Sequence, residues 1–255
     1  MENVFLTELL ERQKENEKIA IKFGENEITY KQFYSDSRKL SNALNDNIAE
    51  SSLNIAIFLP NSINYALAYF SILFSNKIIV PIGTPSKKLE IISTLEYCEI
   101  DVIITSLQYR SFLKECLSLY GYRTMLLFVE DQSIVILNNE KDFIRKSNAI
   151  HNIGHEDDVA ILLHTSGTTS NPKRVMLSHG NLINNVESNI QSLNLTSNDK
   201  VLISMPMYFG YCNTAQFLTH IYLGASMVIL NGLFLPKLFS QTVQNEKITN
   251  FTSVP

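Results

Sequence analysis

The chain has 255 residues, enough for one large or two small domains with a substantial hydrophobic core. It is 45% hydrophobic and 18% charged, as expected of a soluble globular protein. The formal net charge of −4 argues against a general nucleic-acid-binding surface and gives no indication of membrane binding.

The cellular compartment is predicted from the cysteines, the N-terminus and the apolar runs. Cys98, Cys116 and Cys212 are widely spaced and form no metal-binding pattern, so free thiols in a reducing compartment are expected. The charged N-terminus has no signal-peptide core. The longest apolar run, Tyr65–Phe74, is about half a membrane span. We therefore predict a cytoplasmic protein without a membrane span, in which this run forms a buried helix.

Strands and helices alternate through the first half of the chain. After an amphipathic helix within residues 1–18, two strands are expected to pair across a turn at 24–26. Such alternation predicts an α/β fold of layered, mainly parallel sheets flanked by helices. The expected strands lie at 19–21, 27–30, 54–59, 78–81, 102–104 and 124–129. Four helices are expected between these strands. The first has Phe33, Leu40 and Leu44 on its inward face, and the second is capped by Asn61 or Ser62 and ends at Phe74. The third is capped by Ser86 and has Leu89, Ile92 and Leu95 on one face, and the fourth lies near 107–119.

Residues 130–157 are polar and weakly periodic, which indicates a connection between two lobes. We divide the chain on this basis into a first α/β lobe, residues 1–150, and the start of a second, residues 151–255.

The most informative stretch runs from Thr165 to Lys173. It follows an apolar run, 159–163, that predicts a strand buried on both faces, and it precedes a short strand at 174–177. Small residues leave backbone N–H groups accessible, hydroxyls donate to phosphate oxygens, and a lysine adds a mobile positive charge. Gly167 permits close approach or a positive φ. The stretch therefore predicts a loop that holds a polyphosphate.

Two other interpretations were considered for this loop. A Walker A loop requires Gly before the lysine and Ser or Thr after it, whereas Pro172 and Arg174 occupy these positions and a strand follows. A simple Ser/Thr-rich surface loop is common, but the order and density of these residue types between two apolar strands disfavour it.

After the loop, a helix with Leu182, Val186, Ile190 and Leu193 on one face is expected to start at Ser178. The remaining expected elements are strands at 201–204, 226–230 and 250–254 and helices at 213–222 and after Pro236. His151, His155, His164, His179 and His220 show no metal-ligand spacing, and we interpret His179 as structural or helix-capping.

The segment TSGTTSNPK followed by Val175-Met176-Leu177 and Ser178-His179-Gly180-Asn181-Leu182 resembles the phosphate-binding motif of the acyl-adenylate-forming superfamily. This superfamily includes acyl- and aryl-CoA synthetases, adenylation domains of peptide synthetases and luciferases. Ser170 and Arg174 stand where the family most often has Gly. The "LPNS" turn at 59–62 is also similar to that of the family.

The resemblance implies ATP-dependent activation of a carboxylic acid to acyl-AMP, followed by transfer to CoA or a carrier-protein thiol. It assigns ATP binding to Thr165, Ser166, Gly167, Thr168, Thr169 and Lys173. It also implies Mg²⁺. In the family, the segment at 205–211 lines the wall between nucleotide and acid and often contains a His. Here Met207, Tyr208 and Phe209 are candidates for a pocket that favours a hydrophobic or aromatic acid, or for the core.

By the resemblance, the chain corresponds to roughly the first half of the enzyme and forms an incomplete N-terminal large domain. The Mg²⁺ ligand, the main catalytic residues and the C-terminal lid domain would then lie outside this sequence. We expect a fragment that catalyses poorly alone. The alternative hypothesis is a non-catalytic remnant or regulatory nucleotide-binding partner, favoured by Arg174 and the absent His.

Overall fold

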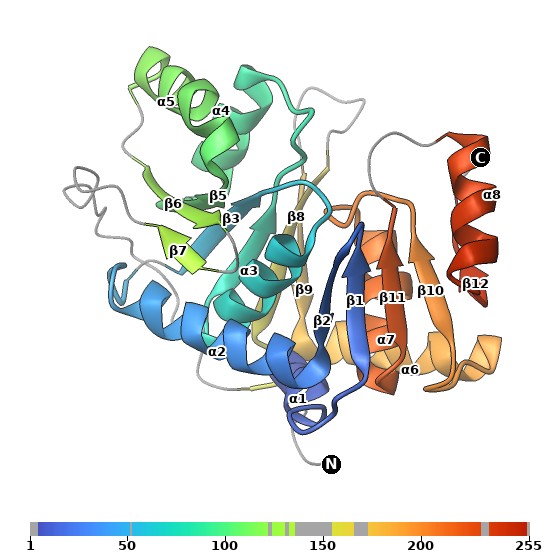
Figure 1. Ribbon diagram of the computed structural model, residues 1–255. Coiled ribbons are helices and arrows are strands. Elements are labelled where there is room, and N and C mark those ends of the chain that lie inside the picture. Colours follow the sequence, from blue (N-terminus) through green and yellow to red (C-terminus); the bar gives the residue numbers. More distant parts are fainter. Residues whose placement is uncertain are drawn as a thin grey trace. The chain divides into compact units, whose positions relative to one another are not determined.

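The computed structural model describes residues 5–51, 53–121, 124–130, 133–135, 155–165, 173–230 and 235–253. Of residues 133–135, 164, 165, 173 and 174 it describes only the backbone. The chain forms two compact units, each with one sheet that can be followed in Figure 1. Unit 1 comprises Met1–Asp36, Pro60–Ile63 and Gly180–Pro255, and unit 2 comprises Ser37–Leu59 and Asn64–His179.

Unit 1 contains a sheet in the order β12-β10-β11-β1-β2, parallel except for the β1–β2 hairpin. Its strands are β1 (Ile19–Phe23), β2 (Asn26–Thr29), β10 (Lys200–Ile203), β11 (Ser226–Ile229) and β12 (Asn250–Phe251). The helices that lie in it wholly or in large part are α1 (Leu6–Glu11), α2 (Tyr30–Asn45), α6 (His179–Leu193), η2 (Cys212–Leu218), α7 (Thr219–Leu223) and α8 (Pro236–Asn245). The buried Tyr30 hydroxyl, 2.6 Å from the carbonyl oxygen of Ala225, ties the start of α2 to the turn before β11.

Unit 2 contains a sheet in the order β7-β6-β5-β3-β4-β8-β9. Its strands are β3 (Asn54–Phe58), β4 (Ile78–Pro81), β5 (Val102–Thr105), β6 (Met125–Glu130), β7 (Ser133–Val135), β8 (Val159–Thr165) and β9 (Lys173–Ser178). The strands β3, β4, β5, β6 and β8 are parallel, and β7 and β9 add antiparallel edges. The helices α3 (Ile63–Phe74), α4 (Lys88–Tyr97) and α5 (Arg110–Leu119) connect parallel strands.

The strand order places these helices on both faces of the unit 2 sheet. The chain moves from β3 to β4 in one direction and from β4 through β5 to β6 in the other, so right-handed crossovers put α3 opposite α4 and α5. Residues of α4 and α5, such as Leu95 and Leu113, share one core with Phe58, Ile103 and Leu126 of the strands. The predicted fold class, layered mainly parallel sheets flanked by helices, is confirmed.

The compact units do not follow the sequence-based division at residues 150 and 151, a boundary that lies outside the described residues. Strand β8 pairs with β4 and β9 pairs with β8, which brings both strands into the sheet formed by the first half of the chain. In the other direction, β1 pairs with β11, which brings the N-terminal hairpin into the sheet of the second half. Strand pairing between segments far apart in the sequence therefore decides which segments belong to each compact unit.

Several local predictions are corrected. Leu89 is 67% exposed, because Ile91, Ile92 and Leu95 form the buried face of α4. That helix starts after Lys87, whose backbone N–H donates to the Glu90 carboxylate, and not after Ser86. Leu193 is 59% exposed in the last turn of α6.

The other corrections concern the extent and type of elements. The helix expected at 213–222 begins with a π-helical segment, η2, and continues as α7. The strand expected at 250–254 is confined to Asn250–Phe251 among the described residues. A short strand, β7, lies in the stretch that we took as a connection.

Candidate functional site

The β8–β9 hairpin carries the predicted phosphate loop. In its antiparallel register Thr165 pairs with Lys173, so the two ends of the loop lie side by side. The loop residues Ser166, Gly167, Thr168 and Thr169 lie outside the described residues, and their assignment stays a prediction. Because β8 is parallel to β4, the loop leaves the carboxyl end of the parallel strands, the edge at which open α/β sheets bind ligands.

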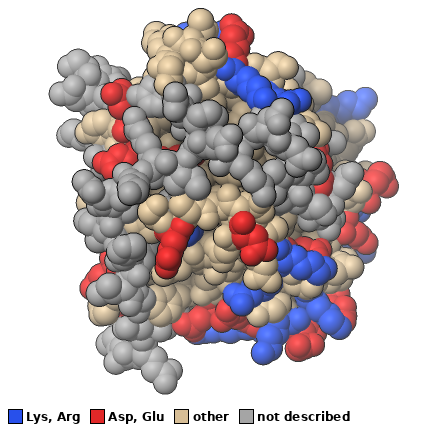
Figure 2. All heavy atoms as spheres, turned by 90° about the vertical axis from the view of Figure 1, so that its left-hand side faces the viewer, with Lys and Arg blue, Asp and Glu red and all other residues tan. Residues whose placement is uncertain are grey.

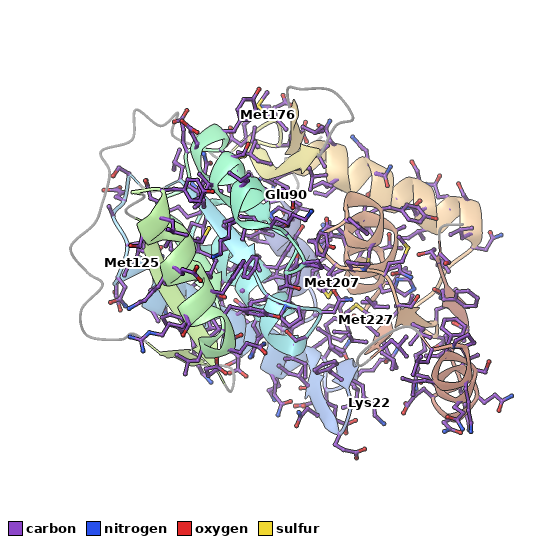
Figure 3. The ribbon with its side chains drawn as sticks, turned by 90° about the horizontal axis from the view of Figure 1, so that it is seen from above. Lys22, Glu90, Met125, Met176, Met207 and Met227 are labelled. Atoms are coloured by element: carbon purple, nitrogen blue, oxygen red, sulfur yellow. The ribbon has the colours of Figure 1, made fainter. Side chains whose placement is uncertain are left out.

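The hairpin has one buried and one exposed strand. Ala160, Ile161 and Leu162 of β8 are buried, as the apolar run predicted. Met176 on β9 is 67% exposed and points outward in Figure 3. The loop thus extends from a strand fixed in the core and returns along the edge strand of the sheet.

His179 follows β9 and begins α6. Its side chain is buried, and burial lowers the pKa of its imidazole to about 4, although the nearby Asp158 carboxylate opposes this shift. The imidazole is therefore neutral near pH 7. A neutral, buried side chain at the start of a helix agrees with a structural role.

We expect His179 to make the protein acid-sensitive. The unfolded chain takes up a proton near pH 6.5, whereas the folded chain resists protonation down to about 4. Stability is therefore full above pH 6.5 and falls as the pH drops towards 4, by about 3 kcal/mol in total. Urea unfolding of wild type and His179→Gln at several pH values measures this, and the variant should show the flatter profile. Equal slopes in the two proteins would contradict the prediction.

The second part of the candidate site is the segment at 205–211, whose start is fixed by Asn61. The Asn61 side-chain amide donates to the carbonyl oxygen of Met205 at 2.8 Å and accepts from the backbone N–H of Met207 at 2.7 Å. These two bonds imitate the pairing of a neighbouring strand. We expected Asn61 or Ser62 to cap α3; the bonds of the Asn61 side chain go to Met205 and Met207 instead, and Ser62 stays the predicted cap. Sequence reasoning missed this role, since its partners lie 144 and 146 residues away.

The three pocket candidates have different environments. Met207 is fully buried, as Figure 3 shows for its inward side chain, and belongs to the core. Tyr208 is half-buried, and burial raises the pKa of its phenol. Phe209 is 45% exposed and packs edge-on against the Tyr208 ring at 4.6 Å. Tyr208 and Phe209 therefore remain the candidates with surface available to a ligand.

The π-helical segment η2 directly follows these residues. π-Helical segments are rare, occur mostly as single-turn bulges inside α-helices, and are frequent at functional sites. Its Cys212 thiol donates to the Gln216 side-chain carbonyl, and the Gln216 amide donates to the carbonyl oxygen of Leu202 at 3.2 Å. Burial raises the pKa of Cys212 to about 12, so this thiol is a neutral donor and not a nucleophile. The polar groups thus hold η2 against the end of β10.

We predict that Asn61→Ala lowers the free energy of unfolding by about 2–3 kcal/mol, because it leaves a carbonyl and an N–H without their partner. Urea unfolding measures the loss. Asn64→Ala is the matched control, since it removes one long hydrogen bond of 3.5 Å to Val129 and should cost less than about 1 kcal/mol. Equal losses in the two variants would contradict the bidentate role of Asn61.

No group of three His, Cys, Asp or Glu side chains in the described ranges could hold a metal ion. Cys98, Cys116 and Cys212 are free and buried. Among the described residues no helix is long and apolar enough to cross a membrane. Figure 2 shows one face on which Lys and Arg side chains lie among Asp and Glu, without a single-sign patch in its described part. The absence of nucleic-acid binding and the cytoplasmic location stay predictions.

Comparison with known proteins identifies relatives over almost the whole chain. The family model described as "AMP-binding enzyme" matches residues 10–255. The long-chain-fatty-acid–CoA ligase of Bacillus subtilis (strain 168) is 26% identical over 94% of this chain and 48% of its own length. Gramicidin S synthase 2 of Brevibacillus brevis is 26% identical over 81% of this chain and 4% of its own length. The chain thus spans about half of the ligase and a small part of the synthase.

Solved structures share the fold. MatB from Rhodopseudomonas palustris without ligand superposes with a TM-score of 0.81 at 19% identity, covering 99% of this chain and 50% of MatB. Its ATP-bound form gives a TM-score of 0.78 at 20% identity, covering 95% and 48%. The two units therefore correspond to about half of a known fold.

Proposed function

The chain belongs to the AMP-binding enzyme family, and from this premise we propose that the full-length protein activates a carboxylic acid with ATP and passes the acyl group to a thiol. The single observation that carries the proposal is the β8–β9 hairpin. It holds both ends of a loop with the family's phosphate-binding sequence at the carboxyl edge of a parallel sheet. The ATP-bound MatB structure supports the choice of nucleotide.

In the proposed reaction, a carboxylate oxygen attacks the α-phosphorus of ATP, a new C(O)–O–P linkage forms and pyrophosphate leaves. The thiol sulfur then attacks the acyl carbon and AMP leaves, with the thiol proton released. Phosphoryl-transfer catalysis depends mainly on positioning and charge neutralisation. In this chain, Ser166, Gly167, Thr168 and Thr169 would supply hydroxyl and backbone N–H donors, and Lys173 would neutralise the β- and γ-phosphates.

Mg²⁺ neutralises phosphate charge in such reactions when it is bound. The described residues contain no group of three His, Cys, Asp or Glu side chains that could hold a metal ion. We therefore assign no Mg²⁺ ligand to this chain and derive no step through the metal.

The acid proposed for this site is hydrophobic or aromatic. Tyr208 and Phe209 present ring surface next to the π-helical segment η2, and apolar side chains line most pockets for such ligands. The thiol is proposed to belong to CoA, which the name of the Bacillus ligase contains, or, by the resemblance to adenylation domains of peptide synthetases, to a carrier protein.

The experiment is ATP–pyrophosphate exchange by the full-length protein across a panel of short, long and aromatic acids. Exchange with at least one hydrophobic or aromatic acid is expected. No exchange with any acid would instead favour a non-catalytic nucleotide-binding partner, the second hypothesis, which Arg174 and the absence of His at 208 and 209 support.

A further inference from the structure

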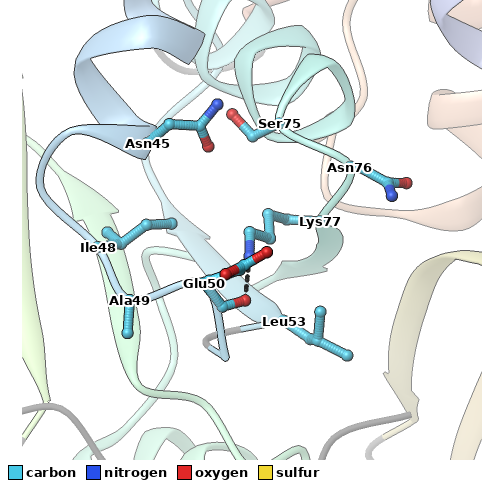
Figure 4. Close-up of a pocket in the computed structure, with 8 residues that line it drawn as sticks. All are labelled: Asn45, Ile48, Ala49, Glu50, Leu53, Ser75, Asn76 and Lys77. Atoms are coloured by element: carbon cyan, nitrogen blue, oxygen red, sulfur yellow. Dashed lines mark hydrogen bonds between the residues drawn. The ribbon is translucent and has the colours of Figure 1, made fainter. Parts of the chain in front are cut away.

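A cavity of about 410 Å³ lies in unit 2, between the segment that follows α2 and the turn from α3 to β4 (Figure 4). Small-molecule pockets occupy about 300–1,000 Å³, so the cavity is large enough for a small ligand. Its lining is mixed: Glu50 and Lys77 carry charges, and Ile48 and Leu53 are apolar.

The cavity is separate from the proposed ATP site. Leu53 and Lys77 directly precede β3 and β4, whose first residues pair in parallel register, so the cavity borders the amino ends of these strands. Strand β8 runs parallel to β4 and ends at Thr165, where the predicted phosphate loop begins. The cavity and the predicted phosphate loop therefore lie at opposite ends of the parallel strands of the same sheet.

Lys77 is the main polar feature of the cavity. The residue is only 8% exposed, and its ammonium group donates to the backbone carbonyl oxygen of Glu50 at 2.6 Å, the bond drawn in Figure 4. An ammonium group has three donors, and no carboxylate of a described residue lies within ion-pair distance. Burial lowers the pKa of Lys77, and the Glu50 carboxylate only partly opposes this shift. A buried cation held by one neutral carbonyl is costly unless an anion also pairs with it.

Two amide side chains lie around the cavity. Asn45 and Asn76 border it, both exposed, and in Figure 4 the Asn76 side chain points away from the Lys77 ammonium, which leaves the Asn45 amide as the second donor group. The hydrogen bond to the Glu50 carbonyl oxygen uses only one of the three donors of the Lys77 ammonium. The other ammonium donors, the Asn45 amide and the open cavity beside them suit a ligand with acceptor oxygens.

We propose that this cavity binds a small monocarboxylate, whose oxygens pair with the Lys77 ammonium and the Asn45 amide. Repulsion by the Glu50 carboxylate grows with the charge of the ligand, so this residue disfavours polyanions such as pyrophosphate more than a monocarboxylate. Ile48 and Leu53 provide an apolar wall for a short carbon stem.

Methyl NMR of the 255-residue chain, labelled at Ile and Leu, tests the site with acetate as the probe. The Ile48 and Leu53 methyl resonances are expected to shift saturably, with half-saturation at ~1–10 mM, the range of one charge-assisted contact in a small ligand. Chloride at equal ionic strength should leave them unchanged, and inorganic phosphate should give the weaker effect. The Lys77 pKa, followed through its side-chain resonances in wild type, should rise when acetate is present.

Three variants separate this site from the proposed ATP site. Lys77→Met should abolish the shift, whereas Lys173→Ala and the exposed-helix control Lys237→Met should retain it. The absence of a saturable shift in wild type, its persistence in Lys77→Met, or tighter binding of phosphate than of acetate would each overturn the proposal. These readouts do not involve catalysis, so failure of the proposed acid activation would leave them unaffected.

Discussion

Replacing Lys173 with alanine is expected to weaken MgATP binding to the full-length protein about 10- to 100-fold, because a charge-assisted hydrogen bond to phosphate contributes roughly 1.5–3 kcal/mol. The backbone pairing of Thr165 with Lys173 places this residue at the point where the predicted loop rejoins the sheet. Isothermal titration with ATP and Mg²⁺ measures the change. Pyrophosphate exchange should fall at least as far, since the same contact is proposed to hold the phosphates during attack.

The matched control is Lys237→Ala, which removes the same charge from an exposed position on α8. Its nucleotide affinity should stay within about twofold of wild type, because exposed charges contribute little at a distance. If Lys173→Ala also stays within that range, Lys173 does not contact the phosphates, and the central residue of the proposed function is lost.

The sequence predicted correctly those strands and helices whose position and buried face follow from the residue pattern of that one segment. The apolar run at 159–163 predicted the buried strand β8, and Pro236 predicted the start of α8. Phe33, Leu40 and Leu44 of α2 are buried in the core, as their spacing predicted. In each case the periodicity of one segment decides which side chains are buried.

Local patterns failed where distant segments decide the outcome. The Asn61 side chain could serve as a cap by sequence, but Met205 and Met207 provide its partners. Leu89 fits a helical stripe, yet the core contacts the face formed by Ile91, Ile92 and Leu95. The pairing of β8 with β4 likewise depends on the three-dimensional arrangement and has no marker in either segment.

The candidate site was partly predictable for the same reason. The phosphate loop is a continuous motif, so residues 165–173 could be identified from the sequence together with their chemistry. The pocket candidates at 207–209 could not be sorted by sequence, because Met207, Tyr208 and Phe209 are all apolar or aromatic. The structure separates them by exposure: Met207 is buried, and Phe209 is 45% exposed.

Phe58→Ala is expected to lower the free energy of unfolding by about 3–5 kcal/mol, the range for truncating a buried aromatic side chain. Phe58 is fully buried on β3, and its ring contacts Tyr109 edge-on at 5.1 Å and stacks on Phe112 at 6.2 Å. The cavity left behind would lie in the core between the unit 2 sheet and α5. Urea unfolding followed by tyrosine fluorescence and circular dichroism measures the loss.

Phe209→Ala makes the same chemical change at a position that is 45% exposed, where the main loss is the contact with Tyr208. It should cost less than about 1.5 kcal/mol. Equal losses at Phe58 and Phe209 would contradict the assignment of Phe58 to the core.

The Phe209→Ala variant also tests the acid pocket: if Phe209 contacts the acid, Phe209→Ala raises the KM for that acid and leaves the KM for ATP unchanged. A change in neither constant would remove Phe209 from the pocket and leave Tyr208 as the ring that faces the acid.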